Sequence, residues 1–236
     1  MYFSKTSNLN ANQIIKVIEL RNYLLKPNLL DRFQRFFQDH FIESQNILNG
    51  YILGQFQIEE IDNRFFWIRG FHDMASRMNF LKSFYDQSIT WKKYGPEAND
   101  MMLNSDQVHL LRPLNSTGDW QSPSHGIILN DFLAKNKMIV IDYYHARPGK
   151  LDELIEQFRA VYVPNPDQEM GNNITLWIAE QTKSEFRHPV IQDTNLLVSI
   201  RAFVNKENYF EHDKKDTKVS RLLGGKESVV LYQFQE

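Results

Sequence analysis

The first half of the chain switches between two spacings of apolar residues. Residues 16–25 (KVIELRNYLL) alternate apolar and polar positions up to Pro27, a pattern that predicts a half-buried strand. Residues 29–41 (LLDRFQRFFQDHF) place apolar side chains three or four positions apart, which predicts an amphipathic helix. The elements predicted for this half are a strand at 16–25, a helix at 29–41, strands at 50–60 and 64–72, a helix that Asp73 caps, and a strand at 107–111.

Two short sequences that favour a turn or a chain break add detail to this order of elements. Asp62–Asn63 is a plausible turn for the hairpin between the second and third strands. Gly95–Pro96 is expected to break the chain ahead of a short helical turn and the last strand.

The same layout recurs about 121 residues later. A shift of 121 pairs Tyr23 with Tyr144 and continues through the first helix and the last strand. In the third strand the shift grows to 132, which pairs Arg69 with Arg201, because the connection around residues 181–189 is longer than its counterpart. A period this long does not fit a solenoid and is typical of duplicated domains.

The order βαββαβ in each half predicts an α+β fold made of two tandem ferredoxin-like units whose antiparallel sheets pack into an α+β barrel. Helices cover one face of each sheet, so the other face must be covered as well. Sheet packing within one chain or between the chains of a homodimer achieves this, and we expect the two sheets to pack face to face within one chain. The expected organisation is a polar tail at 1–13, a first domain at 14–113, a linker at 114–137 and a second domain at 138–236.

Composition narrows the classes of partner. The 236 residues are 42% hydrophobic and 24% charged with a net charge of −2, so nucleic acid and anionic membranes are not the expected partners. The chain contains no cysteine, which excludes disulfides and thiolate chemistry. The first 13 residues lack the pattern of a secretory signal and no apolar run approaches a bilayer span, so we expect a soluble cytoplasmic protein.

Charged residues occupy one face of the predicted strands. Alternation places Glu19, Arg21 and Arg69 on the same face of the first half, and Asp142 and Arg201 on the matching face of the second. The apolar face is expected to receive the helices, which leaves the charged faces to meet inside the barrel as a polar network. Structural ion pairs are the favoured interpretation, and arginines that hold an acidic or carbonyl-bearing ligand are the alternative.

Several segments together resemble the NIPSNAP family of the dimeric α+β barrel superfamily. They are ELRNYLLKPN, FFQDHF, GYILGQF, WIRGFHDMASRMNF and WKKYGPE. The resemblance is close over residues 17–113 and looser over 138–236, where Tyr144 and Arg147 are kept but nothing matches Trp91 or Tyr94. It implies a barrel fold and a mode of sheet pairing, but no reaction. Cofactor-free oxygenases, haem-handling enzymes and interaction modules all occur in the superfamily.

Comparison of the two copies suggests where a ligand would bind. His40 stands where the second copy has Val161, and Arg77 where it has Tyr209. A core histidine and a helix-end salt bridge are the structural alternatives for these two residues. A pocket between sheet and helices of the first half is predicted, and its candidate ligand-binding residues are Arg21, Tyr23, His40, Arg77, Trp91 and Tyr94.

Two functional hypotheses follow from the sequence. In the first, the N-terminal half binds a small organic molecule, either as a binding protein or as a cofactor-independent enzyme. In the second, the chain is a non-catalytic assembly or interaction module whose barrel is filled by its own side chains. Neither a metal nor a cofactor is expected, because phosphate loops, nucleophile elbows and clustered metal ligands are missing from the sequence.

Overall fold

The computed structural model of the chain describes residues 15–114, 138–162, 174–203, 205–207, 209 and 219–234. The predicted tail at 1–13 lies outside the described residues, as does the predicted linker apart from residue 114.

Each half of the chain contributes strands and helices in a similar order. The first half contains β1 (Val17–Leu25), α1 (Leu30–His40), α2 (Ile42–Ile47), β2 (Tyr51–Ile58), β3 (Ile61–Phe71), α3 (Met74–Leu81), the π-helical segment η1 (Lys82–Gln87), α4 (Ile89–Met101), β4 (Met102–Asn104) and β5 (Val108–Pro113). The second half contains β6 (Met138–Ala146), α6 (Leu151–Tyr162), β7 (Ile174–Ala179), β8 (Leu196–Phe203) and β9 (Leu223–Gln233).

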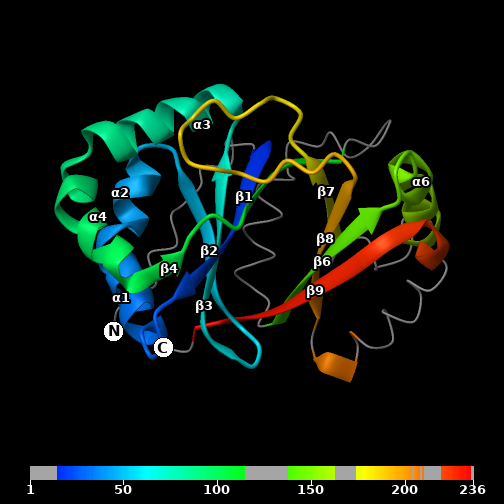
Figure 1. Cartoon of the computed structure of the whole chain (residues 1–236), viewed down its shortest axis with the longest axis horizontal. Helices are drawn as coiled ribbons and strands as arrows, with labels where there is room; N and C mark the ends of the chain where they lie inside the picture. The colour runs from blue at the N-terminus through cyan, green and yellow to red at the C-terminus, as the bar shows by residue number, and fades with distance from the viewer. Residues whose placement is uncertain are drawn as a thin grey trace.

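The strands of both halves form one antiparallel sheet in the order β3-β2-β9-β6-β8-β7-β5-β1-β4. An additional pairing of β3 with β1 closes eight of these strands into a barrel (Figure 1). The halves join where Gln57 of β2 lies opposite Tyr232 of β9, and where Leu111 of β5 lies opposite Ala179 of β7. The expectation that the two sheets combine within one chain is therefore confirmed. Their inner faces share one apolar cluster inside the barrel. Backbone hydrogen bonds also join the two sheets edge to edge, which leaves the barrel without an open seam.

The two halves use equivalent strand orders, β2-β3-β1-β5 and β7-β8-β6-β9. Their registers are equivalent too, because Glu19 lies opposite Arg69 in the first half and Val140 lies opposite Arg201 in the second. The second helix expected in the second half falls mostly on residues 204–218, which lie largely outside the described residues. A complete ferredoxin-like unit therefore stays a prediction for that half.

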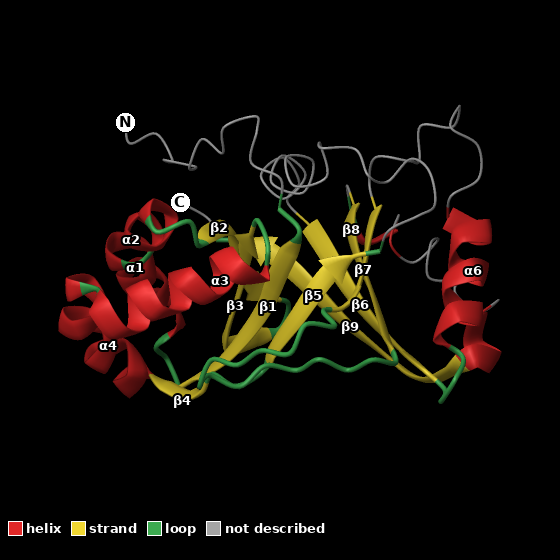
Figure 2. Cartoon of the chain, turned by 90° about the horizontal axis from the view of Figure 1, so that it is seen from above, coloured by secondary structure: helices red, strands yellow, loops and turns green. Residues whose placement is uncertain are grey.

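The barrel interior is apolar, and the helices lie outside it. Strands of both halves supply the interior cluster, which includes Ile18, Leu20, Phe66, Ile68, Ile141, Trp177, Ile200 and Leu231. A second cluster joins the opposite face of β1 and β3 to the helices and includes Tyr23, Phe33, Phe37, Phe65 and Trp67. Figure 2 shows α1–α4 on one side of the barrel and α6 on the opposite side.

The expected assignment of the two strand faces is therefore wrong. The apolar face of β1 turns into the barrel, and the face that carries Glu19 and Arg21 turns toward the helices. The physical reason is that the barrel interior is filled by close-packed side chains, where a charge without a partner is very unfavourable. On the outer face, α3 supplies Arg77 as a further partner for Glu19.

Two local expectations also need correction, and one is confirmed. The hairpin turn lies at Glu59 and Glu60, three residues earlier than expected, with Glu60 at a φ of 58°. Helix α4 continues through Pro96, because the turn after the proline is anchored by buried residues including Met101. Asp73 does cap α3, since its side chain accepts a hydrogen bond of 2.7 Å from the Ser76 backbone N–H.

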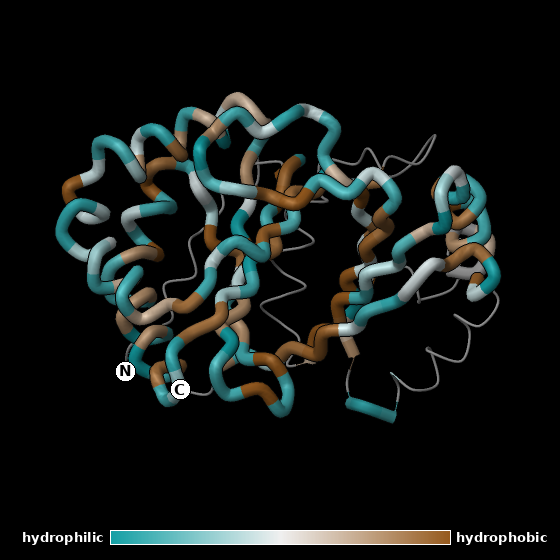
Figure 3. Tube along the Cα trace, viewed as in Figure 1, coloured by the Kyte–Doolittle hydropathy of each residue, from teal (hydrophilic) through white to brown (hydrophobic). Residues whose placement is uncertain are grey.

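The outer helices α1, α2 and α4 mix hydrophilic and hydrophobic residues along their length (Figure 3), as expected for helices with one buried face. Within the described ranges, no helix combines the length and the apolar character that crossing a bilayer requires.

Candidate functional site

A buried carboxylate that three arginines share lies between the sheet and the helices of the first half. Glu19 Oε2 accepts hydrogen bonds from Arg21 Nη1 at 2.7 Å and from Arg69 Nη2 and Nε at 2.6 and 2.9 Å. Glu19 Oε1 accepts one from Arg77 Nε at 2.8 Å. We call Glu19, Arg21, Arg69 and Arg77 the arginine cluster.

The sheet register and one helix bring these residues together. Glu19 and Arg21 are two positions apart on β1, so their side chains share a face, and Arg69 lies directly opposite Glu19 on β3. The first part of α3 places Arg77 above them, and Gln45 of α2 accepts a hydrogen bond of 2.7 Å from Arg69 Nη1. Local strand alternation and the helix crossing thus build the cluster without a special loop.

The cluster is almost completely removed from solvent. Glu19 and Arg69 are 0% exposed, Arg77 is 1% and Arg21 is 6% exposed. Burial by itself would raise the pKa of the Glu19 carboxyl, but attraction to Arg69, Arg21 and Arg77 outweighs it and holds that pKa well below its usual range. Glu19 is therefore ionised at neutral pH.

Aromatic rings and open donors surround the cluster. The guanidinium groups of Arg21 and Arg69 lie 5.0 and 5.1 Å from the ring centroid of Trp67, within the range of cation–π attraction. Arg21 Nε donates to the Tyr23 hydroxyl at 2.8 Å, and burial raises the pKa of Tyr23 to about 12. Trp67 Nε1 and His188 Nε2 are buried and have no hydrogen-bond partner among the described residues.

A segment of the second half covers the cluster. The connection between β7 and β8, residues 180–195, is drawn in yellow in Figure 1 and passes beside α3. Its Ser184 hydroxyl accepts a hydrogen bond of 3.0 Å from Arg77 Nη1. The His188 ring lies 4.4 Å from that of Tyr85 in η1, and Arg187 pairs with Asp86 at 2.6 Å. We call residues 181–190 the cover segment.

The structure divides the six predicted ligand-binding residues into groups. Arg21, Tyr23 and Arg77 lie in or beside the arginine cluster. Trp91 is linked to the cover segment through Tyr85, because its ring lies 4.8 Å from that of Tyr85, which in turn contacts His188.

The other two predicted residues contact each other. The ring of His40 stacks on that of Tyr94, with centroids 3.8 Å apart and an interplanar angle of 6°. Phe36 contacts both rings, edge-on, at 4.7 and 6.0 Å. This stack joins α1 to α4, and its ring contacts among the described residues do not include the arginine cluster.

The predicted barrel network separates into two unconnected sites. Glu19 and Arg69 belong to the arginine cluster, whereas Asp142 accepts hydrogen bonds from Arg201 in the second half. Tyr144 beside Arg201 packs on Phe158 of α6, so this pair also lies on a helix-facing side. The single network between two sheets is therefore wrong, for the same reason as the face assignment.

Four residues of the site were not predicted from the sequence: Gln45, Tyr85, Ser184 and His188. Ser184 and His188 are more than 100 residues away from the cluster in sequence and belong to the other half. The one sequence feature that could have indicated them is the extra length around 181–189, which the barrel alone does not need. Tyr85 lies on the π-helical segment, an irregularity that apolar spacing does not reveal.

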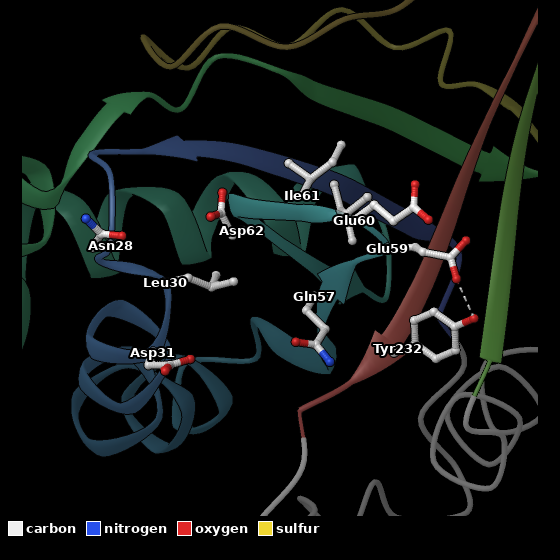
Figure 4. A pocket seen from close by; sticks show the side chains of 10 residues that line it. Asn28, Leu30, Asp31, Gln57, Glu59, Glu60, Ile61, Asp62 and Tyr232 are labelled. Carbon is white, nitrogen blue, oxygen red and sulfur yellow. Dashed lines mark hydrogen bonds between the residues drawn. The ribbon is translucent and has the colours of Figure 1, made fainter.

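A surface cavity of about 750 Å³ lies away from the arginine cluster. It is formed by the β2–β3 turn, the start of α1 and β9, and Figure 4 shows the hydrogen bond between Tyr232 and Glu59 at its edge. Its acidic residues are largely exposed, and Glu59 is already paired with Lys206 at 2.8 Å. None of the six predicted ligand-binding residues lines it, so the pocket expected at those residues is not this cavity.

Metal chemistry has no structural support in the described part of the chain, where no three histidine, aspartate or glutamate side chains are grouped as ligands. The groups that can act on a ligand are the hydrogen-bond donors of the arginine cluster, the Tyr23 hydroxyl and the ring nitrogens of His188. Together they are suited to binding and polarising an oxygen atom rather than to nucleophilic attack.

Fold and site together define an antiparallel α+β barrel protein with a buried, arginine-rich site between sheet and helices. No protein-family model matches the chain, and no curated protein matches its sequence. Solved structures that match over nearly its whole length include two putative monooxygenases. A putative monooxygenase from Fusobacterium nucleatum subsp. nucleatum ATCC 25586 is 12% identical with a TM-score of 0.60, and the match covers 94% of each chain. A putative monooxygenase from Lactobacillus acidophilus NCFM is 10% identical with a TM-score of 0.54, covering 92% of this chain and 93% of that one.

Solved structures similar to this chain also include several NIPSNAP family proteins, each covering less than half of it. An uncharacterized NIPSNAP domain protein from Burkholderia xenovorans is 13% identical with a TM-score of 0.39, and the match covers 44% of this chain and 99% of that one. At these identities the full-length matches show the shared barrel fold alone.

Proposed function

We propose that the chain binds a small organic molecule in its N-terminal half, between the helix-facing side of β1 and β3 and the cover segment. The observation that carries this proposal is the placement of Arg21, Arg77 and the open donor of Trp67 in one buried, aromatic-walled region. A few convergent polar groups in apolar surroundings are the usual composition of a small-molecule site.

The cover segment supports this location because it can be displaced at low cost. Six of its residues are exposed: Gln181, Thr182, Lys183, Glu185, Arg187 and Pro189. The ion pair of Arg187 with Asp86 has side chains 55% and 42% exposed, and pairs of this kind contribute about 1 kcal/mol or less. When the segment moves outward, a ligand at the arginine cluster would enter between Tyr85 of η1 and the side chains of Phe186 and His188, which contact Tyr85 in the closed form.

The catalytic form of the proposal is a cofactor-independent enzyme. Two solved structures with this fold carry the name putative monooxygenase, which makes oxygen-dependent turnover of an organic substrate the first reaction to assay. The fold by itself does not select a reaction, so binding is the primary claim. The proposal also includes two tandem ferredoxin-like units at 14–113 and 138–236, each of which supplies half of the barrel.

The competing function is a non-catalytic assembly or interaction module. It is favoured by the many contacts that the arginine cluster makes within the chain, since Glu19 alone accepts four hydrogen bonds from arginines. In that case the buried groups serve the fold, and the cover segment is a fixed part of it.

A screen of small organic molecules by thermal shift separates the two functions. A ligand present at 100 times its Kd stabilises the native state by about 2.7 kcal/mol, which raises the melting temperature by several degrees. We expect Tyr85→Ala to remove this shift and Tyr232→Phe, at the separate surface cavity, to keep it. Loss of the shift in Tyr232→Phe alone would place binding in the cavity, and a screen without any shift would support the assembly module.

A further inference from the structure

The arginine cluster carries more positive than negative charge. Arg21, Arg69 and Arg77 donate to carboxylate oxygens, and in every case the carboxylate is that of Glu19. The remaining hydrogen bonds of these arginines go to neutral groups of Tyr23, Gln45 and Ser184. Counted over the described residues, three guanidinium groups against one carboxylate leave two positive charges in excess within a region that is nearly closed to water.

The second half of the chain shows that the scaffold does not require this excess. In the equivalent register Val140 replaces Glu19, and Asp142 stands at the position of Arg21. On this face of the second half, the buried charged side chains among the described residues are Arg201 and Asp142, and Lys226 Nζ lies 3.5 Å from Asp142 Oδ1 at the partly exposed edge. The same barrel is thus built with buried charges that nearly balance in the second copy and have a net positive sum in the first.

Donor groups remain available at the positive site. Arg21 Nη2 and Arg77 Nη2 make no hydrogen bond with any described residue, and the same is true of the buried Trp67 Nε1. Arginine presents its donors as a planar fork that matches two oxygens of a carboxylate. The site therefore offers several N–H groups and a positive potential to the same incoming group.

One titratable group of the cover segment, His188, is affected by this positive potential. Burial, together with the positive charges of Arg187, Arg21 and Arg69, lowers the pKa of His188 to about 4. His188 is therefore neutral at pH 7 and does not add to the repulsion, while its Nε2 stays free to exchange a hydrogen bond with a ligand.

Resting on the proposed function, we propose that the ligand is an organic anion whose carboxylate or phenolate oxygen binds Arg21 and Arg77. Its apolar body lies against aromatic rings, those of Tyr85, Trp91 and Phe186, which are already in contact through Tyr85. Binding such an anion offsets the excess charge in a region of low dielectric constant, where the attraction is stronger than in water. A neutral molecule of the same shape gains the ring contacts but not this attraction.

The test compares acids with neutral amides of matched shape: benzoate with benzamide, and 2-naphthoate with 2-naphthamide. Binding to the full chain is measured at pH 7 by thermal shift and by calorimetry. We expect the acids to bind at least about 10-fold more tightly than their amides, and added salt to weaken the acids selectively. Arg77→Gln is expected to remove most of this preference, whereas Arg32→Gln, which removes an exposed arginine paired with Glu97, keeps it.

The outcomes separate this inference from the proposed function. If the amides bind as well as the acids and Tyr85→Ala abolishes both, the site stands and the anion preference is overturned. If none of the four compounds binds, both are overturned. Should Arg77→Gln fail to fold, His188→Phe replaces it, because it removes one donor beside the cluster and keeps an aromatic ring. Retention of the full acid preference in that variant and in Tyr85→Ala would also contradict the inference.

Discussion

The charge excess predicts that two similar arginine substitutions differ in their effect on stability. Arg77→Gln and Arg201→Gln each remove one buried guanidinium group, with exposures of 1% and 2% in the native protein. After Arg77→Gln, the Glu19 carboxylate keeps three of its four hydrogen bonds from arginines. After Arg201→Gln, the partners that Asp142 keeps among the described residues are the Ser199 and Ser228 hydroxyls and Lys226 at 3.5 Å.

The magnitudes follow from what each variant leaves behind. A hydrogen bond to a charged group contributes about 1.5–3 kcal/mol. Guanidinium groups that share one carboxylate lie roughly 6 Å apart, and their repulsion is about 3 kcal/mol at an effective dielectric constant of about 20. Arg77→Gln loses one hydrogen bond to the carboxylate but relieves part of the repulsion between guanidinium groups. We therefore expect it to lower the free energy of unfolding by about 1.5 kcal/mol or less. Arg201→Gln breaks a buried pair and is expected to cost about 3–5 kcal/mol.

Urea denaturation at pH 7, followed by circular dichroism, measures both free energies of unfolding. The expected difference of about 2 kcal/mol is larger than the error of such measurements. An Arg77→Gln variant that is destabilised as much as Arg201→Gln, or more, would refute the reasoning. It would mean that the three arginines and Glu19 form a balanced structural unit, and the argument for an anionic ligand would lose its basis.

Three further predictions concern pH, the aromatic stack and the cover segment. Burial is the main cause that lowers the pKa values of His109 and His188 to about 4. The unfolded chain therefore binds more protons than the native protein between pH 6.5 and 4, and the free energy of unfolding falls as the pH falls through that window. Urea denaturation should show a smaller fall in the double variant His109→Gln, His188→Gln. His40→Val removes the ring stack on Tyr94, so it should lower the free energy of unfolding by about 0.5–1.5 kcal/mol and leave 2-naphthoate binding unchanged. Loss of 2-naphthoate binding in this variant would show that His40 belongs to the ligand site. Arg187→Ala should change stability by less than about 1 kcal/mol but speed amide hydrogen exchange across residues 181–190, and unchanged exchange would contradict the low cost of displacing that segment.

The sequence was sufficient to predict the barrel because the barrel depends on a pattern that occurs twice. The pairs Tyr23 with Tyr144 and Arg69 with Arg201 aligned two copies, and two antiparallel sheets in one chain have few ways to cover their open faces. The orientation of each face could not be predicted in the same way. Alternation along β1 separates Glu19 from Ile18, but it does not say which side closes into the barrel; that depends on packing between strands of different halves.

For the site, comparison of the copies identified residues that the scaffold does not require. Arg77 was found in this way, and it lies in the arginine cluster. The same comparison selected His40 and Tyr94, which instead join α1 to α4. A residue that differs between the copies is therefore one that the shared barrel does not require, and such a residue can serve helix packing as well as ligand binding.

The cover segment explains why a site in one half depends on the other half. Ile191, the residue that follows it, is fixed to β5 by backbone hydrogen bonds: Leu110 N donates to Ile191 O at 3.0 Å, and Ile191 N donates to Val108 O at 2.7 Å. The described contacts of its tip with α3 and η1 are made by side chains, such as those of Ser184 and His188. A segment anchored at its end by the barrel and held at its tip by side chains can open without loss of a strand pairing. The extra length around 181–189 thus gives the second copy a role that closing the barrel does not require, because it shields from water the charges that only the first copy carries.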